Sequence, residues 1–382
     1  MAILPSTSTP LRFTGHQNLR YRILLSILSQ RSILITSIRA DSENPGIRDY
    51  EVSFLRLIER LSNGTLVEIS YTGTEIYVKP GLMAGGTIQH TCPDSRAVGW
   101  FLEPILVLGL FGKTDLKLTL KGITTNNRDV SADTLRTSYL PHLSAFLPAT
   151  VTAPLELRIV KRGFLPSGGG EITYLSPSIR NLKPGYSFTQ PGVVNKIRGI
   201  AHSVRVSPAI SQRLVNGAKE VLSPLCGDCR IYADVYRGTE SGKSPGFAIT
   251  LVATSTTTAL HSSEAVSGSS AASSDVVSEQ NTPEELGAQA AYQLLHNISQ
   301  GACIDKGIEW MACLLMALGS EDVGKVRIAS PADILLIQQL RDMKDFLGVM
   351  VKIRQHDEED TYTLSCVGIG YSNIAKKTAI LA

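Results

Sequence analysis

The chain has 382 residues, of which 43% are hydrophobic and 6% aromatic, and its 37 Lys and Arg nearly balance 34 Asp and Glu. This length predicts two or three domains with buried cores, and the composition excludes a disordered chain, a collagen and a disulfide-stapled domain. The longest apolar stretch, Trp100–Gly112, is too short to cross a bilayer, and residues 1–10 lack the pattern of a secretory signal. We therefore expect a soluble intracellular protein.

The net charge of +3 is unevenly distributed along the chain. The residues up to Arg48 contain six arginines and two acidic residues, and the stretch Ile172–Arg230 contains eight basic and two acidic residues. Local excesses of this kind attract polyanions such as RNA. Charge alone leaves open the alternative that these are ordinary solvated faces.

Short strand-like runs alternate with amphipathic helices in the first half of the chain. Alternation and turn residues predict a hairpin that turns at Thr72–Thr74 and several further elements. These are helices at Asp49–Leu61 and Asp133–Leu147, hairpin strands within Leu66–Val78, and strands at Leu116–Lys121 and Glu171–Leu175. Such a mixture indicates an α+β fold rather than a doubly wound sheet.

A domain boundary is predicted near Pro184-Gly185. The stretch that follows has its own helix, Pro208–Val221, and its own strands, Arg230–Tyr236 and Gly246–Ala253, which is typical of a small inserted domain. We expect residues 1–184 and 282–382 to form the two parts of one large domain, and residues 185–281 to form the insert.

The segment Thr254–Thr282 departs from the rest in composition. Nearly half of its residues are Ser or Thr, and it contains no aromatic residue, Lys or Arg. Such a segment buries too little apolar surface to offset the entropy of ordering, so we predict a disordered loop that ends the insert. Thr282-Pro283-Glu284-Glu285 then has the pattern of a helix start, and the helix Glu284–Ser299 should follow.

Three motifs suggest chemistry without establishing it. Cys226-Gly-Asp-Cys229 has no second pair to complete a zinc site, so reduced thiols are favoured. Gly242-Lys243-Ser244 resembles the end of a phosphate-binding loop, but the required earlier glycine is Arg237, and a turn before a strand is favoured. The run Arg162–Glu171 contains three consecutive glycines that could approach a phosphate or form a tight connection into a strand.

Together with its surroundings, the run Arg162-Gly-Phe-Leu-Pro-Ser-Gly-Gly-Gly-Glu171 resembles the RNA 3′-terminal phosphate cyclase superfamily, from Leu11 to Ala382. Three further runs carry the same resemblance: Asn44–Arg48, Lys79–Gly81 followed by Gly85-Gly86, and Ser299–Asp305. The run Lys196–Pro208 is similar to the cyclase-like branch that works in ribosome assembly. The resemblance implies a large α+β domain of three related α/β units, like the C-terminal domain of a bacterial translation initiation factor, with a smaller α/β insert in the third unit.

The sequence departs from true cyclases at positions that their chemistry uses. Their Glu-Gly-Gly-Gly-Gln stretch is replaced by Thr14–Asn18, and their Gln-His pair by Tyr50-Glu51. Their nucleophilic histidine, which takes AMP from ATP, should lie between Ile328 and Phe346, where this chain has no histidine. The resemblance therefore implies a protein without cyclase activity, and we expect no cofactor and no metal.

The same late segment contains candidate catalytic residues. Ser330-Pro331-Ala332-Asp333 predicts a helix start, and the spacing of Leu336, Leu340, Met343 and Leu347 predicts the buried face of that helix. Arg341, Asp342 and Lys344 should then lie on the opposite polar face, where spacing alone indicates weak ion pairs in solvent. Their pattern resembles a trio proposed in this branch to cleave pre-rRNA, with Asp342 as a base and the two cations facing the phosphate.

The resemblance implies a nucleolar factor of the small-subunit processome, needed for pre-rRNA processing toward 18S rRNA. Its implied partners are pre-rRNA, a ribosome-assembly GTPase and other components of the 90S pre-ribosome, with no membrane. A pre-rRNA endonuclease and an ATP-dependent RNA cyclase are the alternatives. The basic residues that we select as candidate RNA contacts are Arg20, Arg48, Arg162, Lys196, Arg198 and Arg205.

Overall fold

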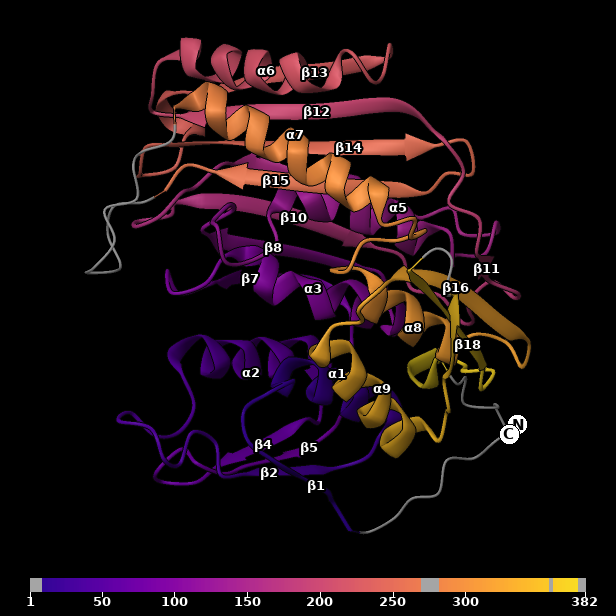
Figure 1. Cartoon of the computed structure of the whole chain (residues 1–382). Helices are drawn as coiled ribbons and strands as arrows, with labels where there is room; N and C mark the ends of the chain where they lie inside the picture. The colour runs from indigo at the N-terminus through magenta and orange to yellow at the C-terminus, as the bar shows by residue number, and fades with distance from the viewer. Residues whose placement is uncertain (1–8, 269–281, 357–359, 377–382) are drawn as a thin grey trace.

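The computed structural model describes residues 9–268, 282–356 and 360–376. Within these residues there are four mixed sheets of four strands each, covered by helices. Figure 1 shows three of them one above another, and the sheet that contains the C-terminal, yellow strands lies beside them at the right. The predicted mixture of strands and helices in α+β layers is confirmed.

The first sheet has the strand order β1-β2-β5-β4, with β1 parallel to β2 and the other neighbours antiparallel. Its helices α1 and α2 pack their apolar faces into the main core. A small two-stranded sheet, β3 with β6, lies beside it. The elements are β1 (Leu11–Thr14), α1 (Leu19–Ser29), β2 (Ile33–Thr36), α2 (Asp49–Leu61), β3 (Ser62–Asn63), β4 (Leu66–Ile69), β5 (Ile76–Lys79) and β6 (Leu82–Met83).

The second and third sheets have the same topology as the first. Each places its strands in the order first, second, fourth and third along the chain, with the first two parallel. The second consists of β7 (Gly86–Thr91), α3 (Val98–Leu108), β8 (Leu116–Gly122), α4 (Ala132–Thr134), the π-helix Leu135–Tyr139, α5 (Leu140–Ser144), β9 (Glu156–Lys161) and β10 (Gly170–Ser176). The third consists of β11 (Ser187–Phe188), α8 (Glu309–Leu318), β16 (Val323–Ala329), α9 (Ile334–Leu347), β17 (Lys352–His356) and β18 (Thr361–Val367).

The fourth sheet belongs to a segment inserted between β11 and α8. Its strand order is β13-β12-β14-β15, and α6 and α7 both cover the face that points toward the viewer in Figure 1. A core separate from the main one fills the space between these helices and the sheet. The elements are β12 (Val194–Val204), α6 (Pro208–Leu222), β13 (Cys229–Tyr236), β14 (Gly246–Ser255), β15 (Leu260–Val266) and α7 (Pro283–Ser299).

The prediction of a disordered loop over Thr254–Thr282 is wrong for its first half. Thr254 and Ser255 end β14, and Leu260–Val266 forms β15, an edge strand paired antiparallel with β14. Ser263 is buried and its hydroxyl donates to the carbonyl of Ala290, so the strand satisfies its polar side chains inside the protein. Residues 269–281 lie outside the described part of the chain.

The contacts also give the insert other boundaries than those predicted from the sequence. The capping box at Thr282 is confirmed, but the helix it starts, α7, buries Leu286 and Leu294 in the insert's own core. The strand β11, in contrast, lies beyond the expected boundary at Gly185 but pairs with β16 of the third sheet. By its contacts, the insert therefore runs from β12 through α7.

The late helix begins later than its sequence indicates. Asp333, not Ser330, caps α9, because its carboxylate accepts a hydrogen bond from the Leu335 amide at 3.1 Å. Pro331 therefore precedes the helix instead of occupying its first turn.

Within the described residues, no helix has the length and apolarity required to span a bilayer.

Candidate nucleic-acid interface

The loops that lead into α1, α2 and α3 meet on one side of the first two sheets. The Ser95 hydroxyl before α3 donates to Asp49 at the start of α2 at 2.8 Å, and the Arg96 guanidinium lies 5.0 Å from the Tyr50 ring centre. His16, just before α1, lies within electrostatic range of Arg39 and Arg48. The starts of three helices therefore lie close together, and the partial positive charge at the start of a helix favours anions.

The loop before α2 is held by one ion pair. Arg39 has a left-handed backbone (φ 48°), and its guanidinium contacts both carboxylate oxygens of Glu51 at 2.7 and 2.8 Å. Glu51 also accepts a hydrogen bond from the Arg48 amide at 2.7 Å. The loop turns at Gly46 (φ 86°), where a Cβ atom would lie 2.6 Å from the Thr72 carbonyl oxygen. Arg48 is thus fixed at the start of α2 while its side chain forms no salt bridge with a described residue.

The start of α3 is capped by a polar turn from the second sheet. Asp129 accepts hydrogen bonds from the Ala97 amide at 2.9 Å and from Asn126, and it forms a salt bridge with Arg96. Arg128, in the same turn, is exposed and forms no salt bridge with any residue that the structure describes. The turn therefore presents a second unneutralised cation beside the same helix ends.

Aromatic rings pack against two guanidinium groups near this junction, those of Arg96 and Arg20. Tyr50 and Trp100 meet edge to face with ring centres 5.0 Å apart, and the Arg96 guanidinium lies 5.4 Å from the Trp100 ring. The Arg20 guanidinium lies 4.6 Å from the Trp100 ring centre and forms a salt bridge with Glu103 at 3.0 Å. Stacking of this kind restricts the guanidinium groups and lowers the entropy lost when an anion binds.

His16 is an exposed titratable group at this junction. Partial burial and then the Arg39 guanidinium lower its pKa from the ordinary value of 6.5, since both disfavour the charged imidazolium. The imidazole is therefore mostly neutral at pH 7. A phosphate bound here would raise the pKa again.

The structure separates the six predicted RNA contacts. Arg48 lies at the junction of the three helix ends, whereas the Arg20 side chain forms a salt bridge with Glu103 inside the protein. Lys196 and Arg198 lie on β12 of the insert. Arg48 was selected because the start of the chain is rich in arginine, and Arg39 belongs to the same arginine-rich stretch. Arg96 and Arg128 were missed, because each stands alone in its local sequence and joins the others only in the fold.

Arg162 is a structural residue. Its side chain is 1% exposed and forms a salt bridge with Asp133 of α4 and another, at 3.3 Å, with Asp234 of the insert. Arg205 donates to the Gly242 carbonyl at 2.6 Å in the same region. The prediction that Arg162 contacts RNA does not fit this burial, since its charge is already neutralised between two domains.

The glycine-rich run and the Gly-Lys-Ser run bind each other. The Gly242 amide donates to the Arg162 carbonyl at 2.7 Å, and the Lys243 amide donates to the Gly168 carbonyl at 2.9 Å. A Cβ atom at Gly242 would lie 2.5 Å from both of those carbonyl oxygens. The two motifs therefore form the joint between the second sheet and the insert. Each also leads into a strand, β10 and β14 respectively, as the simpler interpretation of each predicts.

The three candidate catalytic residues do not share one face. Asp342 is buried, contrary to the prediction of a polar arc, and its carboxylate accepts hydrogen bonds from Arg22 Nε at 3.0 Å and Gln338 Nε2 at 2.9 Å. Arg341 and Lys344 are exposed. The prediction was wrong because α9 packs against both α1 and α8, so two of its faces are covered.

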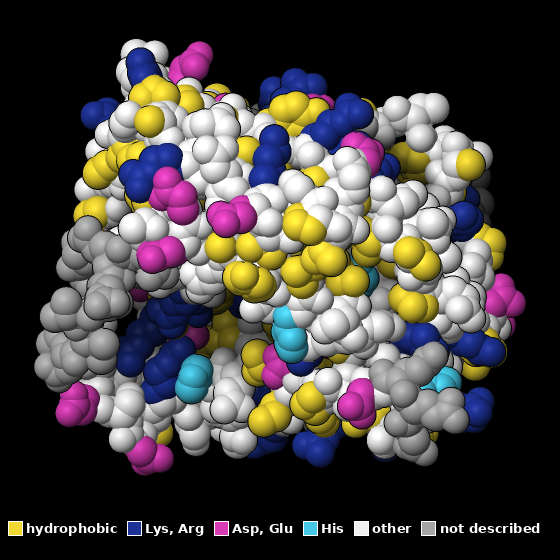
Figure 2. All heavy atoms as spheres, turned by 45° about the horizontal axis from the view of Figure 1, so that its top comes forward, with side chains coloured by type: hydrophobic (Ala, Val, Ile, Leu, Met, Phe, Trp, Pro, Cys, Tyr) yellow, Lys and Arg dark blue, Asp and Glu magenta, His cyan; other side chains and the backbone are white. Residues whose placement is uncertain are grey.

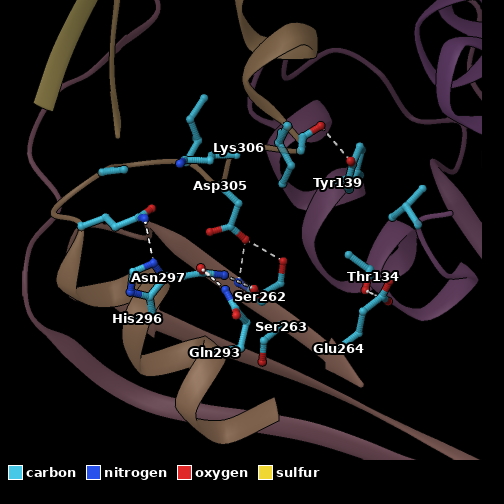
Figure 3. A pocket seen from close by; sticks show the side chains of 16 residues that line it. Thr134, Tyr139, Ser262, Ser263, Glu264, Gln293, His296, Asn297, Asp305 and Lys306 are labelled. Atoms are coloured by element: carbon cyan, nitrogen blue, oxygen red, sulfur yellow. Dashed lines mark hydrogen bonds between the residues drawn. The ribbon is translucent and has the colours of Figure 1, made fainter. Parts of the chain in front are cut away.

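A cavity of about 460 Å³ lies where the insert meets the large domain (Figure 3). Figure 3 shows Asp305 pointing toward Ser262, whose amide and hydroxyl both donate to it at 2.6 Å, and Glu264 beside Thr134. Burial raises the pKa of Glu264. The acidic groups in this cavity are thus held by protein donors, and none of the predicted site residues lines it.

No group of three His, Cys, Asp or Glu side chains in the described part of the chain is arranged to hold a metal ion. Glu309, at the start of α8, is fully buried, and burial raises its pKa to about 8. A neutral carboxyl of this kind is a poor metal ligand at neutral pH. The basic junction is therefore the strongest candidate site.

The chain is similar to known proteins over nearly its whole length. The family model described as RNA 3′-terminal phosphate cyclase matches residues 11–353. The chain is 41% identical to the RNA 3′-terminal phosphate cyclase-like protein of Homo sapiens, over 96% of this chain and 97% of that protein. It is 42% identical to an rRNA processing protein of Schizosaccharomyces pombe, over 97% and 99%, and 39% identical to one of Saccharomyces cerevisiae, over 96% and 97%.

Proposed function

Since the chain belongs to the RNA 3′-terminal phosphate cyclase family, in its cyclase-like branch, we propose that it acts in rRNA processing as an assembly factor of the small ribosomal subunit. In this role it binds pre-rRNA through the junction of α1, α2 and α3. A protein with this role works in the nucleolus, where we expect it to be found. Full-length similarity to two rRNA processing proteins supports this function.

The observation that carries the RNA-binding proposal is the set of cations at the three helix ends. Arg48 and Arg128 lack salt-bridge partners among the described residues, while Arg39 and Arg96 are held in place by Glu51 and Asp129. Figure 2 shows Lys and Arg side chains gathered in a hollow at the left of the view. Guanidinium groups and helix amides are the usual partners of backbone phosphates, which give affinity without sequence preference.

The proposed role does not include RNA cyclisation. A covalent adenylate needs a nucleophilic nitrogen, and the residues just before α9 include Ser330, Pro331 and Asp333 but no histidine. The loop before α1 also lacks the run of glycines that cyclases carry in the resemblance described above. We expect neither ATP nor another cofactor to be required.

We also propose that the exposed side of α9 binds protein partners in the pre-ribosome, among them an assembly GTPase. Ile334, 80% accessible, and the exposed Arg341 are seven positions apart on α9 and therefore lie on the same side, with the exposed Lys344 nearly one turn farther along. A mixed apolar and cationic surface suits a protein interface better than a cleavage site. Asp342, the base that endonuclease activity would need, is already paired with Arg22.

The architecture implied by the resemblance is part of the same proposal. We propose that the large domain consists of three related α/β units and that the insert interrupts the third. The shared strand order of the three sheets supports the repeat, and the position of the insert between β11 and α8 supports the interruption.

Binding of purified protein to a fragment of pre-rRNA tests the function. The double variant R48E/R128E should bind at least tenfold more weakly and should show a shallower dependence of affinity on salt, because fewer counterions are released. K352E/R354E, which reverses two exposed cations on β17, is the matched control and should change little. Equal affinity of R48E/R128E and wild type would place RNA binding elsewhere. With ATP labelled on its α-phosphate, the wild-type protein should not become adenylated.

A further inference from the structure

The insert sheet has one face that its own helices leave open. Alternating residues direct Ile197, Ile231 and Leu251 into the core beneath α6 and α7. The intervening residues of β12 and β13 therefore point to the opposite face, which is turned away from the viewer in Figure 1. Two of these are Arg198 and Arg230.

A basic and aromatic group occupies this open face. In the parallel pair β12–β13, Arg198 is the register partner of Arg230, and Ile200 is the partner of Tyr232. Tyr232 is 59% exposed, and the Arg230 side chain is 66% exposed. Lys196, two residues before Arg198 on β12, is exposed as well. The exposed Tyr232 ring thus lies two residues beyond Arg230 on β13, on the same face as Arg198 and Lys196.

One carboxylate fixes the two arginines side by side. Asp228 accepts from Arg198 Nη2 at 2.7 Å and from Arg230 Nε at 3.2 Å. Arg198 also donates to the main-chain carbonyls of Ile197 and Asp228, at 2.8 and 2.9 Å. The neighbouring acid Asp234 is paired with Arg162, so Asp228 is left to balance Lys196, Arg198 and Arg230, and this face has a surplus of positive charge.

We propose that this face binds single-stranded RNA, with one base stacked on the Tyr232 ring and the adjoining phosphates held by Lys196, Arg198 and Arg230. An aromatic ring on an open sheet gives a sequence-tolerant platform for an unpaired base, and the surrounding cations complement its backbone. Charged side chains dominate this face, namely Lys196, Arg198, Arg230 and Asp228, whereas the centre of a protein–protein interface is depleted of charged residues. The inference rests on the proposed RNA-binding function and adds a second contact on the insert.

Fluorescence binding of a short unstructured RNA to the full-length protein tests the proposal. Y232A should weaken binding about 5- to 100-fold, the range for loss of one base–aromatic stack. Y232F keeps the ring and should bind within about twofold of wild type. Y292A is the control, because Tyr292 is similarly exposed, at 63%, but lies on α7, on the other side of the sheet from Tyr232. This variant should not change affinity.

Photo-crosslinking locates the contact independently of affinity. An RNA that carries 4-thiouridine should crosslink to the tryptic peptide Ile231–Arg237 in wild type and not in Y232A. If wild type binds RNA and R48E/R128E weakens it, but Y232A binds normally and the peptide is not labelled, the second contact is wrong and the proposed function stands. If wild type binds no RNA, the proposed function itself fails. Loss of a protein partner in Y232A, with RNA affinity unchanged, would also overturn the RNA contact.

Discussion

The carboxylate of Asp342 meets its counter-ion across 320 residues of sequence. The Arg22 side chain, 6% exposed, pairs with it at 3.0 Å and also lies 4.4 Å from the Phe13 ring centre. Charges buried in this way are stable only as a pair, because either one alone would lose its hydration without compensation. The pair therefore attaches α9 to α1, and a residue that its local pattern assigns to solvent has a structural role.

We predict that D342A lowers the free energy of unfolding by about 3–5 kcal/mol, because it leaves the Arg22 charge buried and unpaired. The double variant R341A/K344A is the control, since both side chains are exposed, and it should change stability by less than about 0.5 kcal/mol. Urea unfolding followed by circular dichroism measures both. Equal stability of D342A and wild type would show that solvent reaches Arg22.

The lowered pKa of His16 leads to a prediction of how RNA affinity depends on pH. Its pKa in the free protein is below the ordinary 6.5, for reasons of burial and the nearby Arg39. A bound phosphate would raise that pKa, so binding takes up a proton, and affinity should increase as the pH falls below about 6.5. Titration of RNA affinity between about pH 5 and pH 8 measures this effect. H16Q should flatten the profile, and an unchanged profile in H16Q would assign the proton to another group.

At the scale of elements, the Ser- and Thr-rich stretch shows how composition misleads when polar side chains are satisfied internally. β15 carries few large apolar residues, yet it pairs along seven register positions with β14 and packs against α7. Its hydroxyls bond to the main chain of α7 and to Asp305. The strand is thus stabilised by hydrogen bonds and by its neighbour, neither of which composition records.

We predict that deletion of residues 255–278 unfolds the insert, because it removes β15 and exposes one side of β14. Thermal unfolding should show a melting temperature lowered by more than about 5 °C, or loss of the insert's transition, with RNA binding at Arg48 retained if the large domain persists. The variant T256G/T257G alters the β14–β15 turn without removing a strand and is the control. A deletion variant with the wild-type melting temperature would show that β15 contributes nothing to stability.

At the scale of the whole molecule, sequence patterns determined the local elements and the family. The helix Asp49–Leu61 has the predicted bounds, and the capping box at Thr282 starts α7 as its residues indicate. Such features depend on residues three or four positions apart, so a single segment contains the information. The motif around Arg162 likewise indicated the family from one run of residues.

Only the tertiary structure decided which of these residues share a site. Arg48, Arg96 and Arg128 come from three loops separated by tens of residues. Arg48 and Arg96 come together because α2 and α3 start side by side, and Arg128 joins them because its turn caps the start of α3. Asp342 and Arg162 look like solvent-facing charges in their own segments, but packing of α9 on α1, and of the insert on the second sheet, buries both. Burial depends on what covers a face, and the covering elements here are distant in sequence, which is why local periodicity could not predict it.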